Sequence, residues 1–155
     1  MSGVKVNEPY APNWEGFVGA LQDYKATMGA TGIVYKIVGF DAIAFEDVNQ
    51  GDALYARASD GKLGKAIAND TLDKATVAGI AETTQSAGSE VRAIVRGVVA
   101  TSGLDPGDFY FLSNASAGAI TKTAPTTSGH YQTVIGESGT AAQLIVKIEP
   151  PVLLA

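Results

Sequence analysis

The stretch GDFYFLSNASAGAITKT, residues 107–123, nearly repeats an earlier stretch, GDALYARASDGKLGKA, residues 51–66. Each stretch begins with Gly-Asp, continues through residues typical of a strand, crosses a glycine-containing turn and ends in a second strand-like segment. A symmetric β scaffold requires a duplicated strand and turn, whereas catalysis rarely does. The repetition therefore predicts a chain built from two similar β units.

The match extends over nearly everything after residue 31. KLGKA at 62–66 matches AITKT at 119–123, YKIVG at 35–39 matches AIVRG at 93–97, Val77 and Gly79 match Val134 and Gly136, and IVR at 94–96 matches IVK at 145–147. A chance likeness of short β segments is the alternative. We favour an internal duplication, because neither half can bury its apolar face alone and two copies closing on each other hide their strand edges.

The segments between the turns are rich in Val, Ile, Thr and aromatic residues, which favour strands. We predict strands at 33–39, 53–58, 76–82, 91–100, 109–113, 132–137 and 142–149. Helical segments of the length that βαβ units need do not separate them. The prediction is an all-β fold, a compact β-barrel or β-sandwich over residues 31–149, in a chain whose 155 residues fit one domain.

Residues 1–30 are predicted to form an N-terminal arm with a possible short helix. Asn13 can cap a helix over 14–28, where large apolar residues recur at spacings of three and four, and Gly29 can end it. This helix either plugs the core of its own domain or presents its aromatic side chains to another protein.

The composition excludes several classes of partner. The net charge is −5 and the Lys and Arg residues form no basic stripe, so nucleic acid is not expected as a partner. No apolar run is long enough to span a membrane, and the start of the chain lacks the pattern of a secretory signal. The absence of cysteine excludes disulfides and thiolate metal sites. We expect a soluble protein made in a reducing cytosol.

The sequence offers no convincing catalytic or metal-binding constellation. His130 is the single histidine and lies in a predicted turn, and Ser138 in GESGT at 136–140 misses the nucleophile-elbow pattern and is expected to be a turn residue. The acidic residues that most resemble a calcium loop lack its spacing and are expected to be solvated: Asp41, Glu46, Asp47 and Asp52. We therefore predict no enzymatic activity, no cofactor and no bound metal.

The chain ends in the apolar tail LIVKIEPPVLLA, in which Pro150 and Pro151 fix an extended direction. Residues 150–155 either tuck back over the chain's own β body or form an exposed patch that contacts another subunit. For the second case we predict Val152, Leu153 and Leu154 as residues of an oligomer interface.

The pattern GDFYFLSNASAGAITKTAP, followed by VIGES and LIVKIEPPVLLA, resembles the small β domains of tailed-bacteriophage virion proteins, especially capsid decoration or cement proteins. The resemblance covers roughly the last 100 residues, and its motifs are short and centred on glycine. It implies a non-enzymatic homotrimer that binds the major capsid protein on the outside of the assembled capsid and stabilises the head. Assembly would take place in the host cytoplasm.

An arm that reaches across such a shell would suit four N-terminal aromatic residues, which we predict as capsid-binding: Tyr10, Trp14, Phe17 and Tyr24. The alternative function is a trimeric head or tail fibre or a receptor-binding module. Such a module would need an exposed ligand surface on the β body. The nearest candidates are Tyr55, Phe109 and Tyr110, and their strand positions predict core packing instead.

Overall fold

The computed structural model describes residues 36–155, and nearly all of the regular structure in this range is β. The strands are β1 (Val38–Ile43), β2 (Ala53–Ala56), β3 (Leu63–Lys65), β4 (Gly79–Ala81), β5 (Glu90–Ala100), β6 (Phe109–Leu112), β7 (Ile120–Thr121), β8 (Tyr131–Gln132), β9 (Val134–Thr140), β10 (Gln143–Lys147) and β11 (Val152–Leu153). One short helix, α2 (Leu72–Ala75), joins β3 to β4. The all-β prediction is confirmed, and the predicted helix at 14–28 lies outside the described residues.

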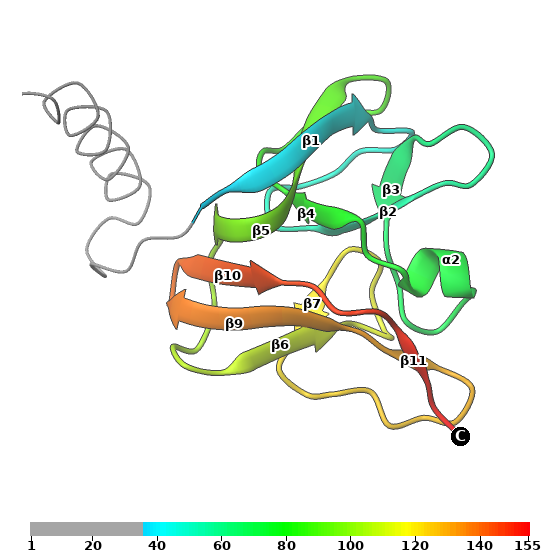
Figure 1. Ribbon diagram of the computed structural model, residues 1–155, viewed down its shortest axis with the longest axis vertical. Coiled ribbons are helices and arrows are strands. Elements are labelled where there is room, and N and C mark those ends of the chain that lie inside the picture. The colour runs from blue at the N-terminus through cyan, green and yellow to red at the C-terminus, as the bar shows by residue number, and fades with distance from the viewer. Residues whose placement is uncertain (1–35) are drawn as a thin grey trace, which may run out of the picture. The chain divides into compact units, whose positions relative to one another are not determined.

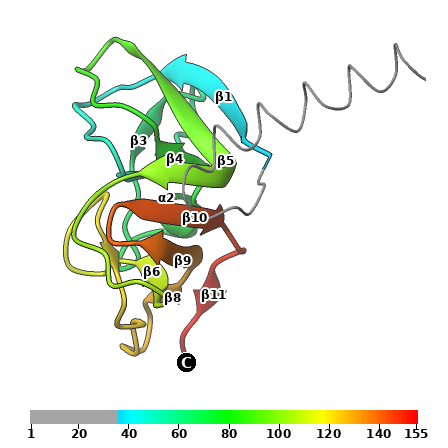
Figure 2. The same ribbon diagram turned by 90° about the vertical axis from the view of Figure 1, so that its left-hand side faces the viewer.

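Nine strands of the described region form one curled, antiparallel sheet. Its order is β3-β2-β4-β5-β10-β9-β6-β7, and β1 also pairs with β5. Figure 1 shows β1 to β4 in the upper half of the described body and β6, β7, β9 and β10 in the lower half, and Figure 2 shows the same division from the side. The long strand β5 belongs to both halves, because it pairs with β1 and β4 near its start and with β10 near its end.

The two halves have equivalent strand pairings, so the predicted duplication is visible in the structure. The first repeat consists of β1, β2, β3, β4 and β5, and the second of β5, β6, β7, β9 and β10 in the same roles. Matching pairs of directly opposed residues are Leu54–Gly79 with Tyr110–Gly136, Tyr55–Gly64 with Phe111–Thr121, Ile80–Ile94 with Glu137–Ile145, and Ala81–Ala93 with Ser138–Leu144. Each of these four pairs agrees with the sequence alignment. The pairing of β1 with β5 is shifted by one residue relative to that of β5 with β10, since Phe40 opposes Ala93 whereas Val98 opposes Ile145.

The Gly-Asp turns that precede β2 and β6 are also the same structure. Gly51 has φ of +89° and Gly107 has φ of +86°, a region that side chains with a Cβ rarely adopt. The N–H of Gly51 donates to the carbonyl of Ala81 at 2.9 Å, and the N–H of Gly107 donates to the carbonyl of Ser138 at 2.9 Å. Glycine is therefore required at both turns by the same backbone geometry.

The turn between β6 and β7 joins the two ends of the curled sheet. Gly118 accepts a hydrogen bond from the N–H of Ala53 at 2.8 Å and donates its own N–H to the carbonyl of Ala66 at 2.7 Å. The N–H of Ala68 donates to the carbonyl of Ser113 at 3.0 Å on the same seam. The second repeat thus satisfies backbone groups at the β2–β3 end of the first, as the prediction of mutual edge closure required.

Two apolar clusters fill the body on opposite faces of β2. Ala53 and Tyr55 face the main cluster, while Leu54 between them faces the minor cluster. The main cluster draws on both repeats: Ala53, Tyr55, Ala66, Ala68, Val77, Ile80, Ile94, Val99, Leu104, Tyr110, Leu112, Ile135, Leu144 and Val146. The minor cluster lies within the first repeat: Ala44, Val48, Leu54, Leu63, Ala81, Val91 and Ala93. The residues 37–155 form one compact unit around these clusters.

Candidate interaction surfaces

The C-terminal tail combines features of both alternatives that the sequence left open. Val152 and Leu153 form β11, which pairs antiparallel with β8, and the N–H of Leu154 donates to the carbonyl of His130 at 2.8 Å. The backbone therefore tucks against the body. The side chains of Val152 and Leu153 nevertheless remain 60% exposed, whereas Leu154 is half-buried. Two of the three predicted interface residues are thus available to a partner.

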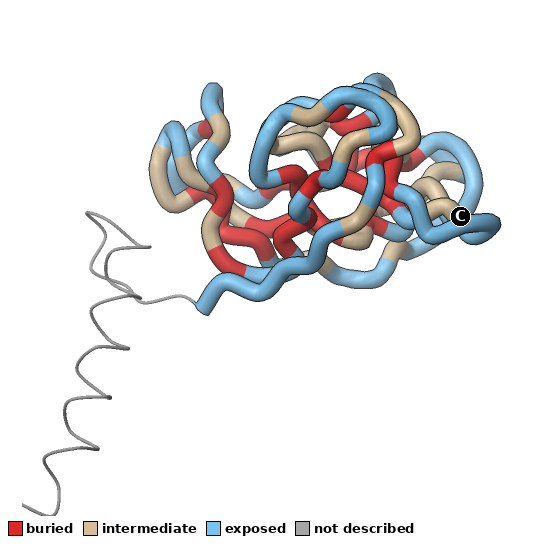
Figure 3. Tube along the Cα trace, turned by 90° about the horizontal axis from the view of Figure 1, so that it is seen from above, coloured by how far each residue is buried: buried red, intermediate tan, exposed pale blue. Residues whose placement is uncertain are grey.

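Strand β1 is a second apolar segment with little cover from the described residues. Val38 is 43% exposed and Phe40 is 38% exposed, and Figure 3 shows the strand as exposed along most of its length. Its backbone pairs with β5 alone, and Ala42 is the β1 side chain that packs against the minor cluster. Aliphatic and aromatic side chains on an edge strand are typical of a surface that contacts another protein.

An ion pair helps to hold β1 on β5. Arg92 Nε donates to Asp41 Oδ1 at 3.0 Å, and the second guanidinium nitrogen reaches Asp41 Oδ2 at 3.1 Å. The hydrogen bond from Arg92 lowers the pKa of the Asp41 carboxyl. Because both side chains are well exposed, this pair orients β1 more than it stabilises the fold.

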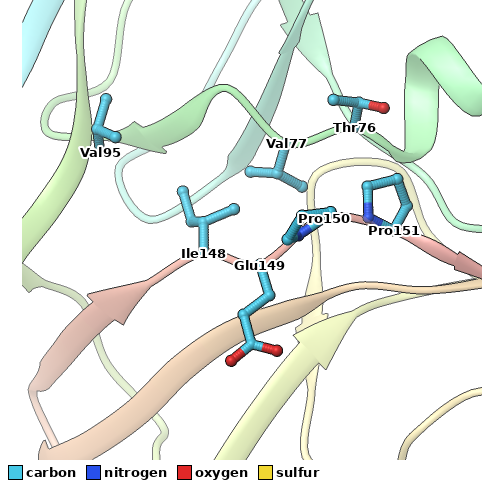
Figure 4. A pocket seen from close by; sticks show the side chains of 7 residues that line it. All are labelled: Thr76, Val77, Val95, Ile148, Glu149, Pro150 and Pro151. Atoms are coloured by element: carbon cyan, nitrogen blue, oxygen red, sulfur yellow. The ribbon is translucent and has the colours of Figure 1, made fainter.

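A groove opens where β5 changes partner. On one edge of β5, β4 pairs with Ala93 and Ile94 and β10 pairs from Arg96 onward, so Val95 lies between the two neighbouring strands. The groove has a volume of about 320 Å³. Its lining residues are shown in Figure 4: Thr76, Val77, Val95, Ile148, Glu149, Pro150 and Pro151. Val77 belongs to the main cluster and Ile148 packs against it, so the groove leads directly to the main core.

The outer face of the second repeat carries a third exposed apolar group. Val98, Ile145, Glu137 and Phe109 oppose one another in turn across β5, β10, β9 and β6, which places them in one row. Within this row Phe109 is 59% exposed. The prediction of core packing is therefore wrong for Phe109.

The same prediction is correct for the two tyrosines. Tyr55 and Tyr110 are buried in the main cluster, and the Tyr110 hydroxyl accepts a hydrogen bond from the N–H of Asp105 at 2.8 Å. Side chains alternate along a strand, so burying Tyr110 turns its neighbour Phe109 outward. The sequence alone did not show which of the two faces of β6 would be covered by the rest of the second repeat.

His130 and Ser138, the two residues considered for catalysis, both make contacts that serve the fold. His130 Nδ1 lies 3.1 Å from Asn114 Nδ2 beside β8. Ser138 is not a turn residue as predicted but a buried member of β9, opposite Leu144, and its hydroxyl donates to the carbonyl of Asp105. The strand continues through GESGT to Thr140 because β10 pairs with it over this length.

The acidic residues of the first repeat do not converge on one point. Within residues 36–155 no group of three or more His, Cys, Asp and Glu side chains is arranged to hold a metal ion. Asp47 accepts from the N–H of Ala87 at 2.8 Å, and Glu46 accepts from the N–H of Lys65 at 2.8 Å. Asp52 is half-buried at the seam between the repeats, where desolvation raises its carboxyl pKa. Glu46 and Asp47 thus accept backbone hydrogen bonds from neighbouring segments of the chain.

No family model matches this sequence, and no curated protein is significantly similar to it. Among the described residues, no helix is long and apolar enough to cross a bilayer. The predicted capsid-binding residues Tyr10, Trp14, Phe17 and Tyr24 lie outside the described residues. Within residues 36–155, the candidate interaction surfaces are β1, β11, the groove at Val95 and the outer face around Phe109.

Proposed function

We propose that this chain is a non-enzymatic structural protein of a phage virion, a decoration protein that binds the assembled major capsid protein lattice as a trimer. The observation that carries the proposal is the exposure of large apolar side chains on β1 and β11. Both strands lie at the surface of a body built around two buried apolar clusters. This distribution suits a protein that acts by contacting neighbours, and it agrees with the family resemblance in the sequence.

The energetics of such contacts fit a clamp. Burying the exposed parts of Val152 and Leu153 against a partner contributes about 1 to 2 kcal/mol for each side chain. Three copies of such a modest contact in one trimer give high avidity without any strong single contact. A protein that binds the assembled lattice and not its separated subunits stabilises the lattice by mass action. The role needs no catalytic group, cofactor or metal.

The proposal places the protein on the outer surface of the capsid after assembly in the host cytoplasm. Its net charge of −5 is compatible with that position, because the outer surface is away from the packaged nucleic acid. Neither nucleic acid nor a membrane is a partner in this proposal.

The direct test is titration of the purified protein onto empty heads built from the major capsid protein that is encoded with this chain. Saturable binding and a higher melting temperature of the decorated heads are expected. V152S/L153S should weaken binding at least about thirtyfold, as the loss of two apolar contacts predicts. L72S is a matched control, because Leu72 is 54% exposed on α2. Binding that is absent for the unaltered protein would overturn the proposal.

The predicted arm has its own test in the full chain. Trp14→Ala and Phe17→Ala together should reduce binding to heads by at least about tenfold if the arm contributes interface hot spots. Unchanged affinity would show that Trp14 and Phe17 do not contribute to binding, and the proposed contacts of the β body would still stand.

A second candidate function is a trimeric fibre or receptor-binding module. The observation that favours it is the exposed Phe109 on the outer face of the second repeat. Binding of the purified protein to host cells, lost on Phe109→Ala, together with no binding to heads, would favour this function over decoration.

A further inference from the structure

Strand β1 leaves one side of its backbone without a neighbouring strand. The N–H of Ala44, just past its end, donates to the carbonyl of Ser89 at 2.9 Å, and the even-numbered residues of β1 turn their backbone groups toward β5 in the same way. Backbone groups alternate along an antiparallel strand, so those of Gly39 and Asp41 turn away from β5. Within residues 36–155, β5 is the only strand that pairs with β1. The N–H and C=O groups of Gly39 and Asp41 can therefore pair with a further strand.

The side chains of this edge do not discourage such pairing. Val38, Phe40 and Ile43 are exposed, and Figure 3 shows the strand at the surface. Edge strands are commonly protected by proline, by lysine or by an unpaired charge. β1 contains neither proline nor lysine, and its single charged residue, Asp41, is already paired with Arg92 of β5. The edge thus has the features of a site where a strand of another chain adds to the sheet.

The residue order of β1 fits a second copy of the same strand running antiparallel. If Phe40 opposes Phe40 of the second copy, Val38 opposes Ala42 and Gly39 opposes Asp41. Apolar side chains then meet apolar side chains on one face, and Asp41 meets a residue without a side chain on the other. Opposed apolar and aromatic pairs stabilise a sheet, whereas opposed like charges destabilise it. The edge is therefore complementary to itself in charge and in side-chain character.

Neighbouring registers and the other exposed strand are less favourable. A shift of two residues in one direction would place the Asp41 side chains of the two copies opposite each other, and the same shift in the other direction would place Asp41 opposite Ile37. A shift of one residue would turn the wrong backbone groups toward each other. β11 offers only two residues, and Pro151 before it has no N–H to donate. A second β1 is therefore the best-matched occupant of the edge.

We propose that β1 of one copy pairs antiparallel with β1 of a second copy about a two-fold axis at Phe40. The pairing is limited to the six residues Val38–Ile43, because the N–H of Phe45 beyond them already donates to the carbonyl of Leu63 at 2.9 Å. So short a contact buries less surface than a standard interface, and a Kd of about 100 µM is expected. The inference goes beyond the proposed function, because its symmetry is two-fold and it can connect two trimers.

Disulfide cross-linking tests both the contact and its register, because the chain contains no cysteine of its own. Under mild oxidation Phe40→Cys in the full chain should form a covalent dimer, since the Cα atoms of this non-hydrogen-bonded pair would lie about 4.5 Å apart. Val38→Cys and Ala42→Cys should each stay monomeric alone and should cross-link to each other when mixed. Leu72→Cys, at an exposed position on α2, is the control and should stay monomeric. A monomeric Phe40→Cys, or no cross-link in the mixture, would overturn the inference.

A charge exchange at the two-fold axis supplies a second readout. Phe40→Lys and Phe40→Glu should each weaken self-association at least about tenfold, because an apolar pair is replaced by two like charges. Sedimentation equilibrium should show that a mixture of the two variants associates more strongly than either variant alone, while the melting temperatures of the dilute variants confirm that they fold. Equal association of the mixture and of the separate variants would contradict the pairing. Titration of the unaltered protein onto heads tests the proposed function separately.

Discussion

The two repeats share a backbone but differ in what covers it. Leu54 opposes Gly79 in the first repeat and Tyr110 opposes Gly136 at the same place in the second. Ile80 of the first repeat is fully buried, whereas its equivalent Glu137 is only half-buried. We infer that the turns and glycines specify the strand pairing in each repeat. The packing of one repeat on the other decides which side chains must be apolar.

The two repeats differ because only one of the two equivalent faces is covered by other side chains. In the first repeat the equivalent face, with Ala53, Ile80 and Ile94, is buried in the main cluster together with side chains of the second repeat. The corresponding face of the second repeat carries Phe109 and Glu137 and has no such cover among the described residues. One face of the duplicated scaffold is therefore free to vary for function.

The largest expected effect comes from adding a methyl group at the equivalent glycines. In Gly136→Ala the new Cβ would overlap the carbonyl oxygen of Ile145, and the rigid backbone cannot yield, so a loss of at least about 4 kcal/mol is expected. In Gly79→Ala the new Cβ would lie 2.8 Å from Cβ of Ala93, and a loss of about 1 to 3 kcal/mol is expected. Urea unfolding measures both. Losses below about 1 kcal/mol for both variants would contradict the close approach of the neighbouring strand at these two positions.

The next comparison concerns the equivalent positions Ile80 and Glu137. Ile80→Ala removes a fully buried side chain and should cost about 2 to 5 kcal/mol of unfolding free energy. Glu137→Ala removes an exposed ion pair with Lys147, at 3.2 Å, and should cost less than about 1 kcal/mol. Thermal unfolding of the two variants should therefore give clearly different midpoints. A similar shift for both would show that the outer face of the second repeat is covered after all.

A smaller effect is expected at the end of the second repeat. Pro150 and Pro151 are equivalent to Val99 and Ala100, which pair with β10 as part of the sheet. Proline has no N–H for such a ladder, so the two prolines protect this end from further pairing. P150V/P151A should increase self-association, which light scattering measures. The free energy of unfolding of the variant should stay unchanged. The control is Pro106→Ala at an exposed proline, and an unchanged state for P150V/P151A would argue against this protective role.

The smallest effect is a local difference between the two hairpin turns. In the first repeat the hydrogen bond from Arg57, at 2.6 Å, lowers the pKa of Asp60 from 3.8 to about 2. A lowered folded-state pKa stabilises the turn above pH 4, and this contribution is lost as the pH falls toward 2. The second hairpin uses Ser113 Oγ, which accepts from the N–H groups of Ala115 and Ser116 and does not titrate.

NMR titration of the backbone amides provides the measurement for this difference. The amides next to Asp60 should shift with a midpoint near pH 2, and Arg57→Ala should return that midpoint toward 3.8. The amide of Ala115 should show no transition of its own in this range. An unshifted midpoint for Asp60 in the unaltered protein would contradict the assignment.

Much of the scaffold could be predicted from the sequence because its signals are local. Glycine is needed at positive φ in both Gly-Asp turns, and β-branched residues between the turns favour strands. The repeat also indicated which segments of the two halves are equivalent, although it did not specify which strands pair or in what register. The short helix α2 was missed, because its four residues, capped by Thr71, are too few to show a helical periodicity.

The candidate surfaces were harder to predict because exposure depends on tertiary cover. Nothing local distinguishes Phe109, which is exposed, from Tyr110, which is buried. Val152 and Leu153 are exposed, and their role at an oligomer interface stays a prediction. Their pairing with β8 joins segments about 20 residues apart and has no sequence signal. The groove at Val95 arises because β5 changes its partner from β4 to β10. The residue pattern of β5 by itself does not indicate such a change.

The most direct test of the central claim is the strand register of both repeats in solution, measured by NMR contacts between opposed residues. Cross-strand contacts are predicted between Leu54 and Gly79 and, at the equivalent place, between Tyr110 and Gly136. A shift of one residue in either repeat, such as Tyr110 opposite Ile135, would contradict a duplicated scaffold with one free face.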